Sequence, residues 1–141
     1  MENEIDRADE GWDVRSMRGV GIGELVVGDA LRLHAGSNRI EVHCPAELTT
    51  DHETVPVHAA TRTNLDRLPQ LLDQVLSEVR AADAGSLRVR FANGWRLDVP
   101  VSSGAFGWVV GLRSGCSVSS LPGGGVRTTD RPGARGAVTN P

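Results

Sequence analysis

The residues with the best claim to metal binding or nucleophilic chemistry are His43, Cys44, His52 and His58. Zinc needs three or four imidazole, thiolate or carboxylate ligands that converge in space. Adjacent strand residues point to opposite faces, so His43 and Cys44 are poorly placed to share one ion. A site built from His43, His52 and His58 depends on the path of residues 45–63, which the sequence does not define. The pattern therefore favours solvated histidines, with a histidine metal site in the 43–58 region as the alternative.

The chain lacks the residues and spacings of common catalytic sites. All fifteen basic residues are arginine and there is no tyrosine, which excludes lysine Schiff bases, lysine general bases and phenolic acids. No Gly-x-Ser-x-Gly elbow is present, and Gly19-Val20-Gly21-Ile22-Gly23 lacks the spacing of a dinucleotide fingerprint. Gly123-Gly124-Gly125 opens no helix, so it is interpreted as the loop that ends the last strand rather than as a phosphate-binding loop. These features predict a non-enzymatic protein without a cofactor.

Charge is distributed unevenly along a chain whose net charge is −3. Residues 1–13 carry six acids against one arginine, residues 127–141 carry three arginines against one aspartate, and residues 14–126 hold eleven of each. A neutral body disfavours nucleic-acid binding, which needs several cations on one surface. No apolar run approaches the roughly 20 residues of a membrane span, and the acidic start is unlike a signal peptide. We therefore expect a cytoplasmic protein that binds neither nucleic acid nor membrane.

A hairpin over residues 87–99 is the clearest element, because apolar and polar residues alternate on both sides of Asn93-Gly94. A two-residue loop would set apolar residues opposite charged ones. A three-residue loop, Ala92-Asn93-Gly94, gives one wholly apolar face. Its predicted pairs are Phe91 with Trp95, Val89 with Leu97, Leu87 with Val99 and, on the other face, Arg88 with Asp98. Gly94 is then expected in the left-handed conformation.

The remaining elements follow from similar patterns. A second hairpin joins residues 30–34 to 39–44, pairing Leu33 with Ile40 and Arg32 with Glu41. Strands are also expected over residues 20–27 (bulged or at an edge), 55–59 (at an edge), 106–112 and 116–121. Leucines at helical spacing predict one amphipathic helix over residues 64–76, with Asn64 as its N-cap. Pro69 fits this helix only if it starts near Leu68 or if its first turn is separate, and residues 76–82 could leave it as a strand. The predicted fold class is α+β, a mainly antiparallel sheet built from hairpins with this helix packed on one face.

Domain boundaries and a contact surface complete the prediction. Residues 1–14 are expected to be a flexible acidic lead-in, residues 15–126 a single domain, and residues 127–141 a flexible tail rich in Gly, Pro and Arg. The outer face of the central hairpin carries Arg88, Arg90 and Arg96 against Asp98, which makes it a candidate contact surface for an acidic partner. Trp12 lies outside the predicted core and is a candidate interface anchor.

Three motifs resemble the pattern of a family of small uncharacterised bacterial proteins common in actinobacteria. They are Asp29-Ala30-Leu31-Arg32-Leu33, the run from Gly85 to Gly94, and Trp108 followed by Ser120-Leu121-Pro122-Gly123-Gly124. The resemblance spans about residues 18–124 and implies a shared fold with no catalytic residue to transfer. Family members continue with a further apolar strand, whereas Gly125-Val126-Arg127-Thr128 runs into a polar tail here. The resemblance therefore implies a short or missing last strand.

The function predicted from these observations is a protein-interaction module that binds another protein or a second copy of itself. Genes of the resembling family lie near toxin or interaction loci, which implies an immunity-like form of that role. Two alternatives remain open at this point: the histidine metal site, and a small-ligand pocket between helix and sheet.

Overall fold

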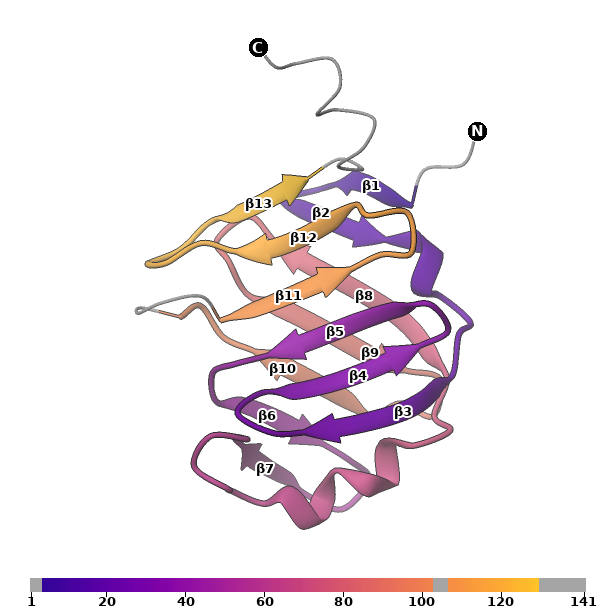
Figure 1. Ribbon diagram of the computed structural model, residues 1–141, viewed down its shortest axis with the longest axis vertical. Helices are drawn as coiled ribbons and strands as arrows, with labels where there is room; N and C mark the ends of the chain where they lie inside the picture. The colour runs from indigo at the N-terminus through magenta and orange to yellow at the C-terminus, as the bar shows by residue number, and fades with distance from the viewer. Residues whose placement is uncertain (1–3, 103–106, 130–141) are drawn as a thin grey trace.

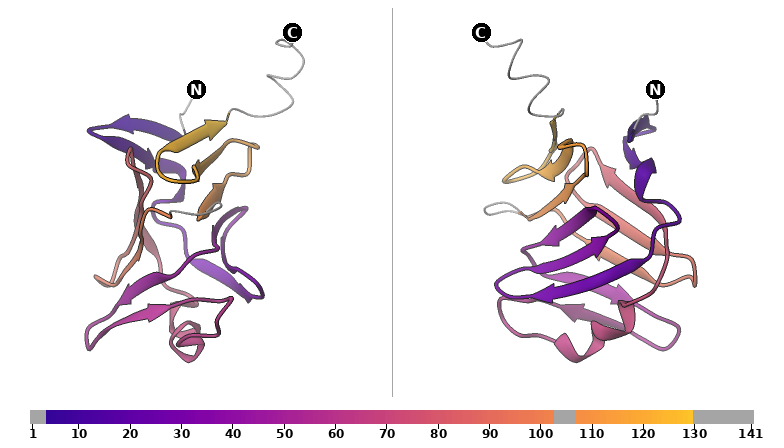
Figure 2. Two further views of the ribbon diagram at one scale, coloured as in Figure 1. Left: turned by 90° about the vertical axis from the view of Figure 1, so that its left-hand side faces the viewer. Right: turned by 45° about the vertical axis from the view of Figure 1, so that its right-hand side comes forward.

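Two antiparallel sheets face each other in the computed structural model, which describes residues 4–102 and 107–129. Figures 1 and 2 show the two sheets as separate layers. The buried hydrophobic side chains of both sheets form one core. Mostly antiparallel sheet was predicted and is confirmed. The arrangement of the sheet as two layers was not predicted.

The seven-stranded sheet has the order β1-β2-β8-β9-β10-β6-β7. Its strands are β1 (Ile5–Ala8), β2 (Gly11–Val14), β8 (Leu76–Ala82), β9 (Leu87–Phe91), β10 (Arg96–Val99), β6 (Ala46–Thr49) and β7 (Thr54–Val57). The six-stranded sheet has the order β13-β12-β11-β5-β4-β3. Its strands are β13 (Val126–Thr129), β12 (Ser117–Ser120), β11 (Trp108–Gly111), β5 (Asn38–Val42), β4 (Leu31–Ala35) and β3 (Ile22–Val27).

The core fills the space between the two sheets. Leu33, Ile40 and Trp108 from the six-stranded sheet are fully buried, as are Val89 and Leu97 from the seven-stranded sheet. The apolar face of the central hairpin was expected to pack on a helix, and a second sheet covers it instead. Each sheet thereby buries the apolar side of its alternating strands.

The central hairpin has the predicted register. Val89 pairs with Leu97, Leu87 with Val99 and Arg88 with Asp98. The Phe91 amide donates to the Trp95 carbonyl at 2.9 Å, and Gly94 has φ +94°. The three-residue loop and its left-handed glycine are therefore confirmed.

Three other strand predictions agree with the structure. Leu33 pairs with Ile40 and Arg32 with Glu41 in the β4–β5 hairpin. Strand β3 lies at a sheet edge and its register shifts between Ile22 and Glu24, as its glycines indicated. Strand β7 forms the other predicted edge. Pro56 is tolerated there because an edge strand can turn the position of its missing N–H away from the sheet.

The predicted helix over residues 64–76 is wrong in length and type. The segment forms two three-residue 3-10 turns, η2 (Leu65–Arg67) and η3 (Pro69–Leu71), and β8 already begins at Leu76. Pro69 cannot donate a backbone hydrogen bond within a continuous helix. Asn64 adopts φ +52° and donates its side-chain amide to the Pro56 carbonyl, so it does not cap a helix.

The predicted flexible ends are partly ordered. Residues 5–14 form the β1–β2 hairpin, which extends the seven-stranded sheet beside β8 and continues into the 3-10 turn η1 (Arg15–Met17). The acids of this segment find cations: Asp6 pairs with Arg15, and Asp13 pairs with Arg18. Strand β13 includes residues 127–129 of the predicted tail, and residues 130–141 lie outside the described residues. None of the described helices is long and apolar enough to cross a membrane.

Candidate functional site

A groove of about 660 Å³ lies on the outer face of the seven-stranded sheet. Strands β8, β9, β10, β6 and β7 contribute its floor, and the β1–β2 turn contributes one end. Its charged lining residues are Asp9, Glu10, Glu47, Arg80, Arg88 and Asp98. Three exposed proline rings, those of Pro45, Pro56 and Pro100, add apolar surface. This volume lies in the range of sites that bind small molecules or a few peptide residues.

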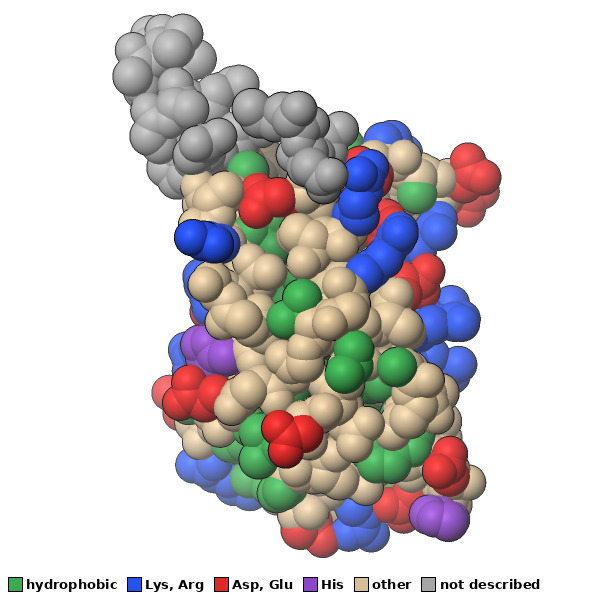
Figure 3. All heavy atoms as spheres, turned by 90° about the vertical axis from the view of Figure 1, so that its right-hand side faces the viewer, with side chains coloured by type: hydrophobic (Ala, Val, Ile, Leu, Met, Phe, Trp, Pro, Cys, Tyr) green, Lys and Arg blue, Asp and Glu red, His purple; other side chains and the backbone are tan. Residues whose placement is uncertain are grey.

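The charged residues of the groove floor form one row that crosses the strands. Arg80 on β8 pairs with Arg88 on β9, Arg88 with Asp98 on β10, and Asp98 with Glu47 on β6. Strands keep these side chains on one face because side-chain direction alternates along each strand. Like charges are thus directly opposed twice, which costs a few tenths of a kcal/mol or more each time. In Figure 3 the outer face of this sheet is the right-hand edge, where acidic and basic side chains lie close together.

Other opposed like charges on this face are compensated by neighbouring ions. Arg90 and Arg96 are opposed, but Arg90 lies 3.4 Å from Glu78 and Arg96 lies 2.5 Å from Asp98. Arg88 lies 3.4 Å from the other oxygen of Asp98. The three arginines predicted to meet an acidic partner therefore share one face, and each already pairs with a carboxylate of the same sheet.

The two ends of the row are compensated less. The Arg80 guanidinium donates to the Asp9 backbone carbonyl, which is neutral. Glu47 is exposed, and no cation contacts its carboxylate among the described residues. The groove floor therefore has arginines over β8 and β9 and carboxylates over β10 and β6, and Asp9 and Glu10 of the β1–β2 turn line the end beside β8.

Trp12, the other predicted contact residue, is placed differently. It lies on β2 opposite Ala81 of β8, partly buried against the core. The Arg7 guanidinium stacks 5.1 Å from its ring centre. Arg7 in turn makes two hydrogen bonds with Asp83, at 2.6 and 2.7 Å. These contacts account for Trp12 as the residue that docks the first hairpin onto its own domain.

The four candidate residues for metal or nucleophile chemistry do not converge. His43 Nε2 lies 3.2 Å from Glu41, and His58 Nδ1 lies 3.1 Å from the Thr61 hydroxyl. His52 lies in the exposed turn between β6 and β7. No group of three or more His, Cys, Asp or Glu side chains within residues 4–102 and 107–129 could hold a metal ion. Cys44 is a half-buried free thiol, and burial raises its pKa, which disfavours the nucleophilic thiolate.

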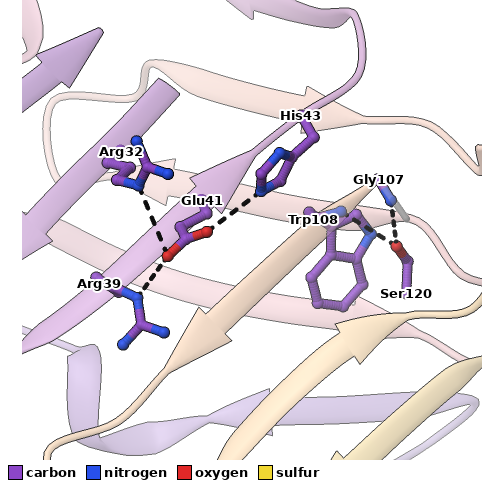
Figure 4. A network of polar contacts seen from close by, with 7 residues as sticks. All are labelled: Arg32, Arg39, Glu41, His43, Gly107, Trp108 and Ser120. Atoms are coloured by element: carbon purple, nitrogen blue, oxygen red, sulfur yellow. Dashed lines mark hydrogen bonds and ion pairs between the residues drawn. The ribbon is translucent and has the colours of Figure 1, made fainter. Parts of the chain in front are cut away.

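Glu41 is the most strongly held carboxylate of the six-stranded sheet's outer face (Figure 4). Its oxygens lie 2.6 Å from Arg39, 3.2 Å from His43 and 3.8 Å from Arg32. Burial raises the pKa of Glu41, but the hydrogen bonds from Arg39 and His43 outweigh it and hold the pKa below its ordinary value. Arg39 fits here because it lies over Gly111, where a Cβ atom would come within 2.8 Å of the guanidinium carbon.

Replacing Glu41 with glutamine is expected to flatten the acid side of the stability profile. A carboxyl whose pKa is lower in the folded state stabilises the fold above its ordinary pKa of 4.5, and this contribution disappears as the pH falls through the lowered value. Urea unfolding at pH 7, 5, 4 and 3 should show the wild type losing more stability than Glu41→Gln on acidification. Arg39→Gln should flatten the profile too. Parallel profiles for Glu41→Gln and the wild type would contradict this account.

Two loops close one corner of the sandwich, and the motif residues meet there. The Trp108 indole N–H donates to the Gly85 carbonyl at 2.9 Å, and the buried Ser120 hydroxyl oxygen accepts the Trp108 amide at 3.1 Å. The Gly125 amide donates to the Ala84 carbonyl at 2.8 Å. The stretch from Pro122 to Gly125 is thus the turn between β12 and β13, and it docks on the β8–β9 turn. The prediction that this stretch ends the last strand is wrong, because β13 follows it.

A two-sheet antiparallel β-protein with a charged groove is the class that the structure defines. The chain belongs to a family of unknown function (DUF6188), whose family model matches residues 13–130. The predicted resemblance to a family of uncharacterised proteins is therefore confirmed. No curated protein and no solved structure matches the chain significantly.

Arg80 and Glu47, the ends of the groove row, were missed by sequence reasoning. Both occupy outward positions of alternating strands, over residues 76–82 and 46–49. That alternation was the available signal. The leucine pattern before Leu76 and the prolines around residues 45–56 obscured it.

Proposed function

We propose that this protein is a non-enzymatic interaction module that binds a segment of another protein in the groove of the seven-stranded sheet. The observation that supports this most is the row of opposed like charges, Arg80 with Arg88 and Asp98 with Glu47. Residues that break a local rule of sheet stability are expected at functional positions. The groove adds concavity and apolar proline surface, which favour a docked chain over a solvated face.

Charge reversal in the groove tests this function. The full chain, immobilised, should retain a protein from a lysate of its source cells, and that protein is then identified and produced recombinantly. Arg88→Glu should weaken its binding at least tenfold by calorimetric titration. The matched control Arg127→Glu changes an exposed arginine of β13 on the other sheet, and should stay within about twofold of the wild type.

Three outcomes would contradict the proposal. The first is that no protein is retained, and the second is that the retained protein binds Arg88→Glu as tightly as the wild type. The third is a dimer of the isolated chain, seen by light scattering, that Arg88→Glu dissociates. That result would make a second copy of this chain the occupant of the groove.

A further inference from the structure

The order of charges across the groove specifies the chemistry of its occupant. Within one register row, arginines lie over β8 and β9 and carboxylates lie over β10 and β6. Arg80 and Glu47 mark the ends of this row, and neither contacts an opposite side-chain charge among the described residues. An occupant that neutralises both ends needs an acidic group at one end and a basic group at the other.

The strand spacing sets the distance between those two groups. Arg80 and Glu47 lie on strands three steps apart, β8 to β9 to β10 to β6. At about 4.8 Å per step, the ends of the row are about 14 Å apart. An extended peptide rises about 3.3 Å per residue, and residues i and i+4 point to the same side at about 13 Å. The two lengths agree.

We infer that the groove binds an extended peptide segment that carries an acidic residue and a basic residue four positions apart, lying across the strands. The acidic side chain meets Arg80 and Arg88, and the basic side chain meets Glu47 and Asp98. The three prolines lie at the Glu47 and Asp98 end of the row, where Pro56 pairs with Glu47 and where Pro45 and Pro100 flank β6 and β10. They offer the basic end of the segment apolar surface that donates no backbone hydrogen bond. This inference rests on the proposed function and names the partner chemistry of the same site.

The groove's own geometry argues against a purely acidic occupant. Its charged lining comprises four acids and two arginines. Asp9 and Glu10 lie at the end beside Arg80 and Glu47 lies at the other end, and no ion pair neutralises the three carboxylates among the described residues. Only an acid held directly between Arg80 and Arg88 avoids like charge, so each further acid of a segment would meet one of these carboxylates. Like-charge contacts of this kind disfavour the wrong partner and so add specificity. The mixed-charge segment satisfies both halves of the row at once.

Synthetic peptides test the inference with the full chain. The probe is a fluorescein-labelled peptide of serine and threonine residues with one glutamate and, four positions later, one arginine. Its matched controls carry the same two residues two positions apart, the glutamate alone, or the arginine alone. Fluorescence anisotropy should show the four-position peptide binding at least tenfold more tightly than each control. Equal binding of all four peptides, or no binding of the first, would overturn the inference.

Reciprocal charge reversal separates binding from folding. Arg80→Glu and Glu47→Arg should each weaken binding of the four-position peptide at least tenfold, because each places like charges together. The double variant Arg80→Glu/Glu47→Arg should regain several-fold over either single variant, since the peptide can lie in the opposite direction. Glu24→Arg on β3, an exposed acid of the other sheet, is the control. No recovery in the double variant would overturn the inference.

The two tests fail independently. Suppose that a cellular partner loses its binding to Arg88→Glu while none of the peptides binds. That result would support the interaction module and contradict the four-residue spacing. Peptide binding without a groove-dependent cellular partner would remove the proposed function and retain the specificity of the groove.

Discussion

Gly85→Ala is expected to lower the free energy of unfolding by about 3 kcal/mol. Gly85 has φ +116°, and a Cβ atom there would lie 2.9 Å from the Gly125 amide nitrogen and 3.1 Å from its carbonyl oxygen. These neighbours are backbone atoms, so no flexible side chain can move away. The Gly125 amide also donates to the Ala84 carbonyl. Relief of the clash would therefore weaken the hydrogen bond that joins the two turns.

The matched control is Gly94→Ala in the central hairpin. Gly94 has φ +94°, and nothing lies within 4 Å of its Cβ position. Gly94→Ala should lower the free energy of unfolding by only about 1 kcal/mol, the cost of an alanine in the left-handed conformation. Urea unfolding followed by tryptophan fluorescence measures both variants. Should Gly85→Ala fail to fold, Gly124→Ala is a milder test, because its Cβ position lies 3.2 Å from the Ala84 carbonyl oxygen. Equal losses for the corner and hairpin variants would contradict a docked corner.

Local pairing was predictable because two signals agreed at each hairpin. In the central hairpin, alternation and the Asn93-Gly94 turn together allowed only one register with a wholly apolar face, and that register is the one observed. The β4–β5 hairpin was predictable for the same reason. Edge strands followed from single residues, such as Pro56, that a central strand does not tolerate.

The layering of the sheets was not predictable, because it depends on contacts distant in sequence. Leucines spaced three and four apart between Leu65 and Leu76 match an amphipathic helix. In the structure, Leu68, Leu71 and Leu76 are all buried in the core, but Leu68 lies between the two 3-10 turns, Leu71 ends the second turn and Leu76 begins β8. In a short segment at the end of a β-sandwich, the spacing of apolar residues does not distinguish an amphipathic helix from two 3-10 turns followed by a strand. The β1–β2 hairpin was missed for a related reason: its acids suggested disorder, whereas Trp12 and Val14 face the core.

The candidate site illustrates what composition alone conceals. The outer arginines Arg88, Arg90 and Arg96 were identified from the hairpin and do share one face. Asp98, which pairs with Arg88 and Arg96, was already visible in the hairpin, whereas Glu78 on β8, the partner of Arg90, became visible only with the sheet order. The uneven row from Arg80 to Glu47 likewise depends on the order β8-β9-β10-β6, in which β6 joins from a distant part of the chain.

The family motifs now have a structural explanation. Gly85, Trp108 and Ser120 belong to three separate stretches of the sequence, and hydrogen bonds connect them at one corner. The turn from Pro122 to Gly125 docks at the same place. This corner lies between the two sheets, whereas the charged row of the groove lies on the outer face of one. The motif residues therefore define the fold, and none of them belongs to the charged row.

Trp108→Phe is expected to destabilise the protein by about 3 kcal/mol, from a carbonyl left without its donor, about 1–3 kcal/mol, and a partly filled indole site. Trp108 is fully buried, and its indole N–H reaches the buried turn at Gly85. Thermal unfolding followed by circular dichroism should show a melting temperature lower by roughly 6–12 °C. Trp12→Phe, at a partly exposed ring stacked on Arg7, should lose about 1 kcal/mol or less.

Combining Trp108→Phe with Gly85→Ala gives the decisive comparison. Both changes disrupt the same contact between the β8–β9 turn and the six-stranded sheet. The double variant should therefore lose less free energy of unfolding than the two single variants lose together. Gly94→Ala lies at the opposite end of β9 and should combine additively with Trp108→Phe. Strict additivity of the corner pair, or a loss for Trp108→Phe no larger than for Trp12→Phe, would show that the indole hydrogen bond does not join the two sheets.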